Sequence, residues 1–68
     1  MKITITHKNK AYSISYRQVN ENEPLQANGI RMLFLGMIAR HEPDMKLAQE
    51  EMNKNDQNIE VYQIEVSN

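Results

Sequence analysis

Residues 2–17 read KITITHKNKAYSISYR, and this stretch predicts a β-hairpin. In its first half, Ile3 and Ile5 alternate with polar residues, and in its second half Tyr12 and Ile14 alternate with serines. Alternation with a period of two places the apolar side chains of a strand on one face of a sheet. The hairpin therefore has an apolar face that another part of the chain must cover.

The turn of this hairpin is expected at Asn9-Lys10, because asparagine tolerates the positive φ that a two-residue hairpin turn requires. This turn sets Ile5 opposite Ile14. A slip by one residue would set isoleucine against serine, so the apolar pattern specifies which residues share a face. His7, close to the turn, is expected to be half-buried on the apolar side.

The length and composition limit how this fold is stabilised. The chain has 68 residues, the size of a single domain. A core this small supplies no more than about 3–5 kcal/mol without disulfides, metals or association. Cysteine is absent, so neither a disulfide nor a thiolate metal site is available. The two histidines are too few for a histidine-based metal centre without several carboxylates. Association with another chain is the remaining aid, and it indicates a protein partner.

The chain contains no long apolar segment. The longest apolar run, residues 32–39, is far shorter than the roughly 20 residues that cross a bilayer. The alternating residues at the start of the chain do not resemble the continuous apolar stretch of a signal peptide. Together with the absence of cysteine, these features predict a cytoplasmic protein that binds no membrane.

The middle of the chain predicts helices. Asn28 is the expected N-cap, and apolar residues recur at helical spacing from Ile30 onward. Pro43 disfavours helical geometry at the residue before it, so we expect either a bend or a second helix over residues 44–53. Residues 59–66 are rich in β-branched side chains and predict a third strand.

These elements predict an α+β fold, a single ββα(α)β domain over residues 1–68 with a three-stranded antiparallel sheet and the helices on one face. If Pro43 separates two antiparallel helices, the third strand pairs with the second strand. If one bent helix continues instead, the third strand pairs with the first. The third strand is also ambiguous in facing, with Ile59 and Val61 on one face and Tyr62, Ile64 and Val66 on the other. Either both faces are covered near its start, or a bulge switches the facing.

The first helix is apolar on two faces. The face expected to cover the hairpin consists of Ala27, Ile30, Leu33, Phe34, Met37 and Ile38. The opposite face is a stripe of Met32, Leu35, Gly36 and Ala39, flanked by Arg31 and Arg40. Two interpretations stay open. Either the second helix covers the stripe with Met45, Ala48 and Met52, or the stripe is an interface for a second copy or another protein.

The polar face of the hairpin is a second candidate surface. Its basic residues are Lys2, Lys8, Lys10 and Arg17, and it includes no acidic residue. Positive charges beside hydroxyl groups suit an acidic protein or the phosphates of nucleic acid. Both hairpin tyrosines face the other way, however, so we expect no aromatic platform for stacked bases. The net charge of −1 is also unlike that of most nucleic-acid-binding domains.

Patterns typical of catalysis and metal binding are missing. His41, Glu42 and Asp44 form the only tight cluster of titratable residues, and its position at a helix end favours a capping role. Since no nucleophile motif or glycine-rich phosphate loop occurs, we expect no enzymatic activity, cofactor, metal or small-molecule substrate. The sequence thus predicts a small non-catalytic protein-interaction module (an inhibitor, adaptor or subunit) that self-associates through the helix at residues 29–41. Nucleic-acid binding through the basic hairpin face is the alternative.

Overall fold

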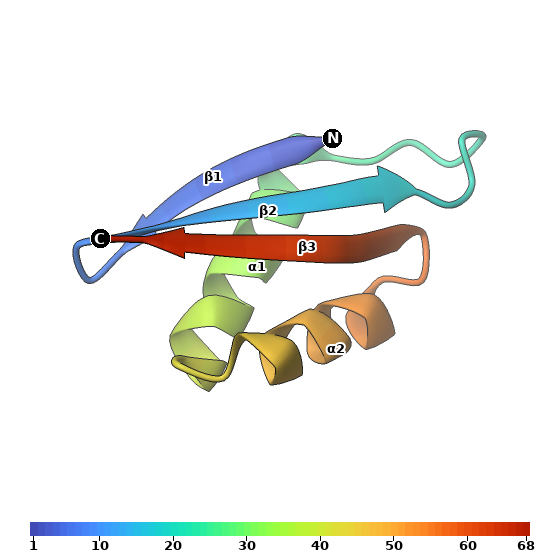
Figure 1. Cartoon of the computed structure of the whole chain (residues 1–68). Coiled ribbons are helices and arrows are strands. Elements are labelled where there is room, and N and C mark those ends of the chain that lie inside the picture. Colours follow the sequence, from blue (N-terminus) through green and yellow to red (C-terminus); the bar gives the residue numbers. More distant parts are fainter.

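The computed structural model describes all 68 residues, which form one sheet and two helices. The elements are β1 (Lys2–His7), β2 (Lys10–Gln18), α1 (Ala27–His41), α2 (Met45–Asn55) and β3 (Ile59–Ser67). The strands form an antiparallel sheet in the order β1-β2-β3. Both helices lie on the same face of this sheet (Figure 1). The α+β prediction is confirmed, and β3 pairs with β2, as expected if Pro43 separates two helices.

The hairpin turn lies one residue earlier than predicted. Lys8 and Asn9 form the turn, both at positive φ (51° and 66°), and His7 pairs with Lys10. Ile5 therefore lies opposite Tyr12, so the predicted register is wrong by two residues. A two-residue turn of this kind needs positive φ at both central positions, and asparagine is here the second of them. Because the shift is two residues, the apolar side chains of both strands keep their predicted face.

The helix ends follow local hydrogen bonds. The prediction that Asn28 caps α1 is wrong: the helix begins at Ala27 after Gln26, whose side chain makes no capping bond. At α2 the cap is a side chain, since the Asp44 carboxylate accepts a hydrogen bond of 3.1 Å from the backbone N–H of Leu47. Neither helix has the length and apolarity needed to span a membrane.

The core lies between the sheet and the two helices. Its buried residues are Ile5, Tyr12, Ile14, Ile30, Phe34, Ile38, Ala48, Met52, Ile59 and Val61. Phe34 is at the centre, fully buried, and meets the ring of Tyr16 edge to face at 5.3 Å between ring centroids. Ala27 was expected on this face but is exposed, because it is the first residue of α1.

A bulge in β3 resolves the facing of that strand. Ser15 pairs with Gln63 but Tyr16 pairs with Val61, so Tyr62 is an extra residue on the β3 side. Val61 before the bulge and Ile64 after it consequently both face the helices. Tyr62 itself is 49% exposed. The predicted alternative of a bulge is confirmed.

Candidate functional site

The outward face of α1 carries the most exposed large apolar side chain of the molecule. Met32 is 68% exposed, and Ala39 is also exposed. Gly36 lies between them, and a Cβ placed on it would meet no atom within 4 Å. Ala48 and Met52 of α2 face the core instead and are fully buried. The second helix therefore leaves this part of the stripe uncovered.

The other residues predicted for this stripe divide between two directions. Leu35 is half-buried and packs against the core. Arg31, one turn earlier on the same side of α1, donates a hydrogen bond of 3.0 Å from its guanidinium to the backbone carbonyl of Thr4 in β1. Arg40 is exposed. The outward surface, called here the α1 face, thus consists of Met32, Gly36, Ala39 and Arg40.

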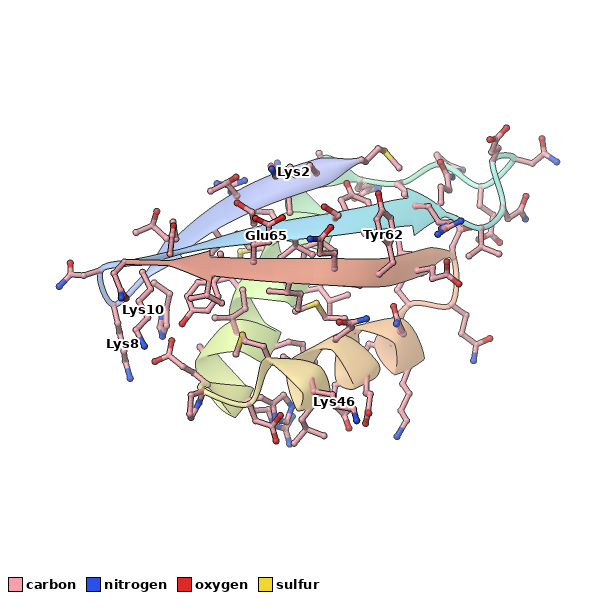
Figure 2. All side chains as sticks on the ribbon, in the orientation of Figure 1. Lys2, Lys8, Lys10, Lys46, Tyr62 and Glu65 are labelled. Carbon is pink, nitrogen blue, oxygen red and sulfur yellow. The ribbon has the colours of Figure 1, made fainter.

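The structure does not bring the four predicted basic residues onto one surface. Lys2 lies on the outer face of the sheet, while Lys8 and Lys10 lie at the hairpin tip, on the side of the helices (Figure 2). Arg17 is on the outer face and forms an ion pair of 2.7 Å with Glu60 of β3. The charges of Lys8 and Lys10 instead act on the carboxylate of Glu42, at the corner between the helices.

The third strand changes the outer face in two ways. It adds the carboxylates of Glu60 and Glu65, so the face carries both signs of charge. It also adds an aromatic ring: the Arg17 guanidinium carbon lies 5.0 Å from the ring centroid of Tyr62. The expectation of an outer face without an aromatic residue is therefore wrong. The ambiguous facing of residues 59–66 was the signal that could have revealed Tyr62.

A polar contact joins the hairpin to the corner between the helices. The Tyr12 hydroxyl donates a hydrogen bond to Oε2 of Glu42. This hydrogen bond, together with burial, raises the pKa of Tyr12 to about 12. The same bond lowers the pKa of Glu42. Burial opposes this effect, and the charges of Lys10 and Lys8 add to it. Nε2 of His7 is buried without a hydrogen-bond partner.

This contact predicts a loss of stability in acid. The folded state lowers the pKa of Glu42 below its ordinary value of 4.5, so its contribution is present above that pH and disappears as the pH falls through the folded-state value. For Tyr12, whose pKa is raised, the contribution to stability is present below pH 10.0 and is lost as the pH rises toward about 12. Urea unfolding of Glu42→Gln and the native chain measures the effect. The stability difference between them should shrink between neutral pH and pH values below 4.5. An equal stability difference at neutral and at acidic pH would contradict this prediction.

The predicted cluster at the helix end is divided among separate tasks. Asp44 caps α2, and Glu42 accepts from Tyr12. His41 is the last residue of α1, and its carbonyl accepts a hydrogen bond of 2.7 Å from the backbone N–H of Asp44. No three side chains of histidine, aspartate or glutamate come together in an arrangement that could hold a metal ion.

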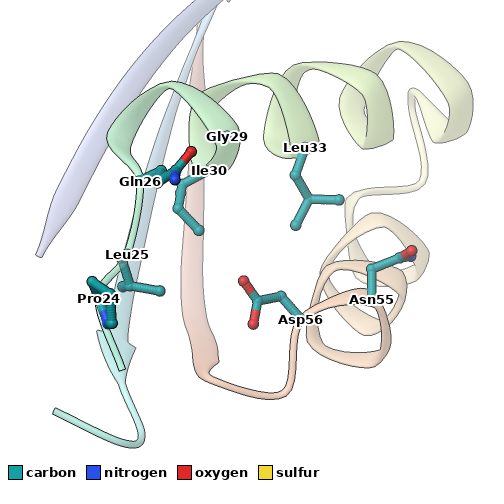
Figure 3. Close-up of a pocket in the computed structure, with 8 residues that line it drawn as sticks. All are labelled: Pro24, Leu25, Gln26, Gly29, Ile30, Leu33, Asn55 and Asp56. Atoms are coloured by element: carbon teal, nitrogen blue, oxygen red, sulfur yellow. The ribbon is translucent and has the colours of Figure 1, made fainter. Parts of the chain in front are cut away.

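A shallow groove lies where the 20–26 linker and the end of α2 meet the start of α1 (Figure 3). Its volume is about 340 Å³, and its lining comprises Pro24, Leu25, Gln26, Gly29, Ile30, Leu33, Asn55 and Asp56. The Asp56 carboxylate at its rim accepts a hydrogen bond of 2.9 Å from the backbone N–H of Asn58. No sequence signal predicted this groove, because it combines segments that are distant in the chain.

Comparison with protein-family models, with curated proteins and with solved structures finds no match to this chain.

Proposed function

We propose that this chain is a small, non-catalytic, cytoplasmic protein-interaction module that self-associates through the α1 face and acts as an inhibitor, adaptor or subunit. The observation that carries the proposal is the exposure of Met32 (68%) beside Gly36 and Ala39. An exposed methionine is a flexible and polarisable contact residue. The small neighbours let a second backbone approach closely.

The order of large and small residues on α1 supports a symmetric contact between two copies. In an antiparallel pair of α1 helices, a two-fold axis between Leu35 and Gly36 sets Met32 against Ala39 of the second copy. Gly36 lies beside this axis and leaves room for the second backbone. The large Met32 of each copy then meets the small Ala39 of the other, which favours interdigitated helix packing. Two-fold contacts of this kind are the commonest form of self-association.

The flanking arginines predict how salt acts on this contact. The same two-fold axis brings Arg31 toward Arg40 of the second copy, and like charges repel. The hydrogen bond to Thr4 turns Arg31 toward β1 and reduces this repulsion. Added salt screens what remains, with a Debye length that falls to about 8 Å near physiological ionic strength. Association through the α1 face is therefore expected to strengthen with salt.

Sedimentation equilibrium of the native chain and of Met32→Glu tests the proposal. We expect a native dimer that tightens with salt and a monomeric Met32→Glu. The variant should keep its stability within about 0.5 kcal/mol, because Met32 is a surface residue. Leu47→Glu is the matched control, since Leu47 is exposed on α2 and its loss should leave the dimer intact. A native chain that stays monomeric at every concentration refutes self-association, and equal dissociation by Leu47→Glu refutes the assignment to α1.

Nucleic-acid binding is the second candidate function. The pairing of Arg17 with the exposed ring of Tyr62 favours it, because bases stack on such aromatic side chains. The carboxylates of Glu60 and Glu65 on the same face oppose it. Titration of the sedimentation samples with single-stranded DNA at low salt separates the two candidates, because phosphate contacts give an affinity that falls steeply as salt is added.

A further inference from the structure

The hydrogen-bond pattern of the sheet identifies the backbone groups that are free at its edges. Met1 and Tyr16 exchange two bonds, from Met1 N to Tyr16 O (2.7 Å) and from Tyr16 N to Met1 O (2.8 Å). Bonded pairs alternate along antiparallel strands, so Ile14 also turns its N–H and C=O toward β1. Ser13 and Ser15 then turn theirs toward β3.

On β3 the same alternation leaves Ile64 and Val66 facing outward. Glu65 lies opposite Ser13 and Gln63 lies opposite Ser15, so these two residues bond to β2. The backbone N–H and C=O groups of Ile64 and Val66 consequently point away from the sheet. No side chain or other element donates to them or accepts from them.

At two other points of the sheet edges, side chains bond to the outward backbone groups. On β1, Arg31 binds the carbonyl of Thr4. On β3, Asn53 accepts from Val61 N–H at 2.7 Å and donates to Val61 C=O at 3.3 Å, and Gln49 donates to the same carbonyl at 2.9 Å. Covered edges prevent pairing with other chains. The stretch Ile64–Val66, called here the open edge, lacks such cover.

The side chains of the open edge present two different surfaces. Ile64 and Val66 lie opposite the buried Ile14 and Tyr12, so both face the helices, yet Val66 remains 46% exposed. Glu65 faces the outer side. Its carboxylate bonds only to the amide of Gln63 (2.9 Å), and no lysine or arginine pairs with it. An added strand would therefore meet apolar side chains on one side and an unpaired carboxylate on the other.

We propose that the open edge binds an extended segment of another protein by strand addition. The segment alternates apolar residues, which pack beside Ile64 and Val66, with lysine or arginine residues, which lie beside Glu65. Backbone hydrogen bonds supply affinity in this mode, and alternate side chains supply specificity. The inference goes beyond self-association through α1 and does not depend on it.

Charge selects this partner over a second copy of β3. Residues 42–68 carry two lysines against seven acidic residues. Pairing β3 with itself about Ile64 would bring two such segments together and set Glu65 diagonally beside Glu65 of the other copy. Like charges on adjacent strands are destabilising. A basic segment instead neutralises Glu65.

A short blocked peptide of alternating valine and lysine is the probe, and Val66→Pro is the first variant. Proline removes the outward N–H without touching the ladder to β2, so the fold should survive. We expect peptide binding to weaken about tenfold, as the loss of one edge bond and the bulk of the ring imply. Thr6→Pro is the matched control, because Thr6 presents its N–H at the edge of β1, and it should bind like the native chain.

A pair of charge reversals separates specific pairing from general attraction. Glu65→Lys should weaken binding several-fold more than Glu21→Lys, which makes the same change of charge in the linker. A peptide with its valines and lysines in two blocks should bind poorly, and amide exchange of Ile64 and Val66 should slow in the complex. The proposal is overturned if the probe does not bind, if Val66→Pro binds it as well as the native chain, or if both charge reversals act equally. Sedimentation of Val66→Pro keeps the two proposals distinct, because self-association through α1 should persist in it.

Discussion

Phe34→Ala is expected to leave most of the protein unfolded at room temperature. Phe34 is fully buried, and its ring meets Tyr16 edge to face at 5.3 Å. Truncation of a buried phenylalanine to alanine costs about 3–5 kcal/mol, because apolar contacts are lost and a cavity is left. A domain of this size has roughly 3–5 kcal/mol of stability from its core. The loss of unfolding free energy in Phe34→Ala is thus about as large as the total stability.

Urea titration followed by circular dichroism measures this effect. The native chain should show a cooperative transition, whereas Phe34→Ala should start largely unfolded and lose its remaining structure without a plateau. Leu47→Ala is the control, because Leu47 is 39% exposed on α2, and it should shift the unfolding free energy by no more than about 0.5 kcal/mol. A native-like transition in Phe34→Ala would mean that the centre of the core lies elsewhere.

Asn53→Ala is expected to destabilise the fold by about 1–3 kcal/mol, the cost of leaving partly buried polar groups without partners. The amide of Asn53 satisfies both backbone groups of Val61 on the side away from β2. Val61 is 1% exposed, so water replaces these bonds poorly. Gln49 still donates to the Val61 carbonyl in the variant, which leaves the N–H as the group without a partner.

Asn55→Ala is the matched control for this second effect. The side chain of Asn55 bonds only to the carbonyl of Glu51 within the same helix and is exposed. Its removal should change stability by no more than about 0.5 kcal/mol. Hydrogen exchange adds a local measurement, since the amide of Val61 should exchange much faster in Asn53→Ala. Equal losses of stability in both variants would show that the bonds of Asn53 to Val61 stabilise the fold no more than the exposed bond of Asn55 does.

The sequence predicted the faces of the hairpin better than its register. Alternation alone assigned Ile5 and Ile14 to the core, and both are buried. The same alternation is satisfied by turns at Lys8-Asn9 and at Asn9-Lys10, because the two registers differ by two residues. Only the requirement for positive φ at both turn positions distinguishes the two registers. Lysine is not a residue typical of positive φ, so the sequence does not indicate a turn at Lys8.

The candidate surfaces could be predicted only in part. The exposure of Met32 agrees with the helical spacing, but Leu35 turned out half-buried, since the packing of α1 against the sheet covers that side. The bulge was one of two predicted alternatives, so the outward position of Tyr62 could have been predicted. The contacts of Arg31 and Asn53 with the sheet edges could not be predicted, because the sequence does not indicate which distant backbone atom a polar residue on a helix will contact.

The hydrogen bond from Arg31 to Thr4 joins α1 to the edge of the sheet. One guanidinium both borders the α1 face and shields the middle of β1. The bond occupies the Thr4 carbonyl, which a neighbouring strand would otherwise use as an acceptor, and it ties the first turns of the helix to the outermost strand. A change at Arg31 is therefore expected to alter both surfaces at once.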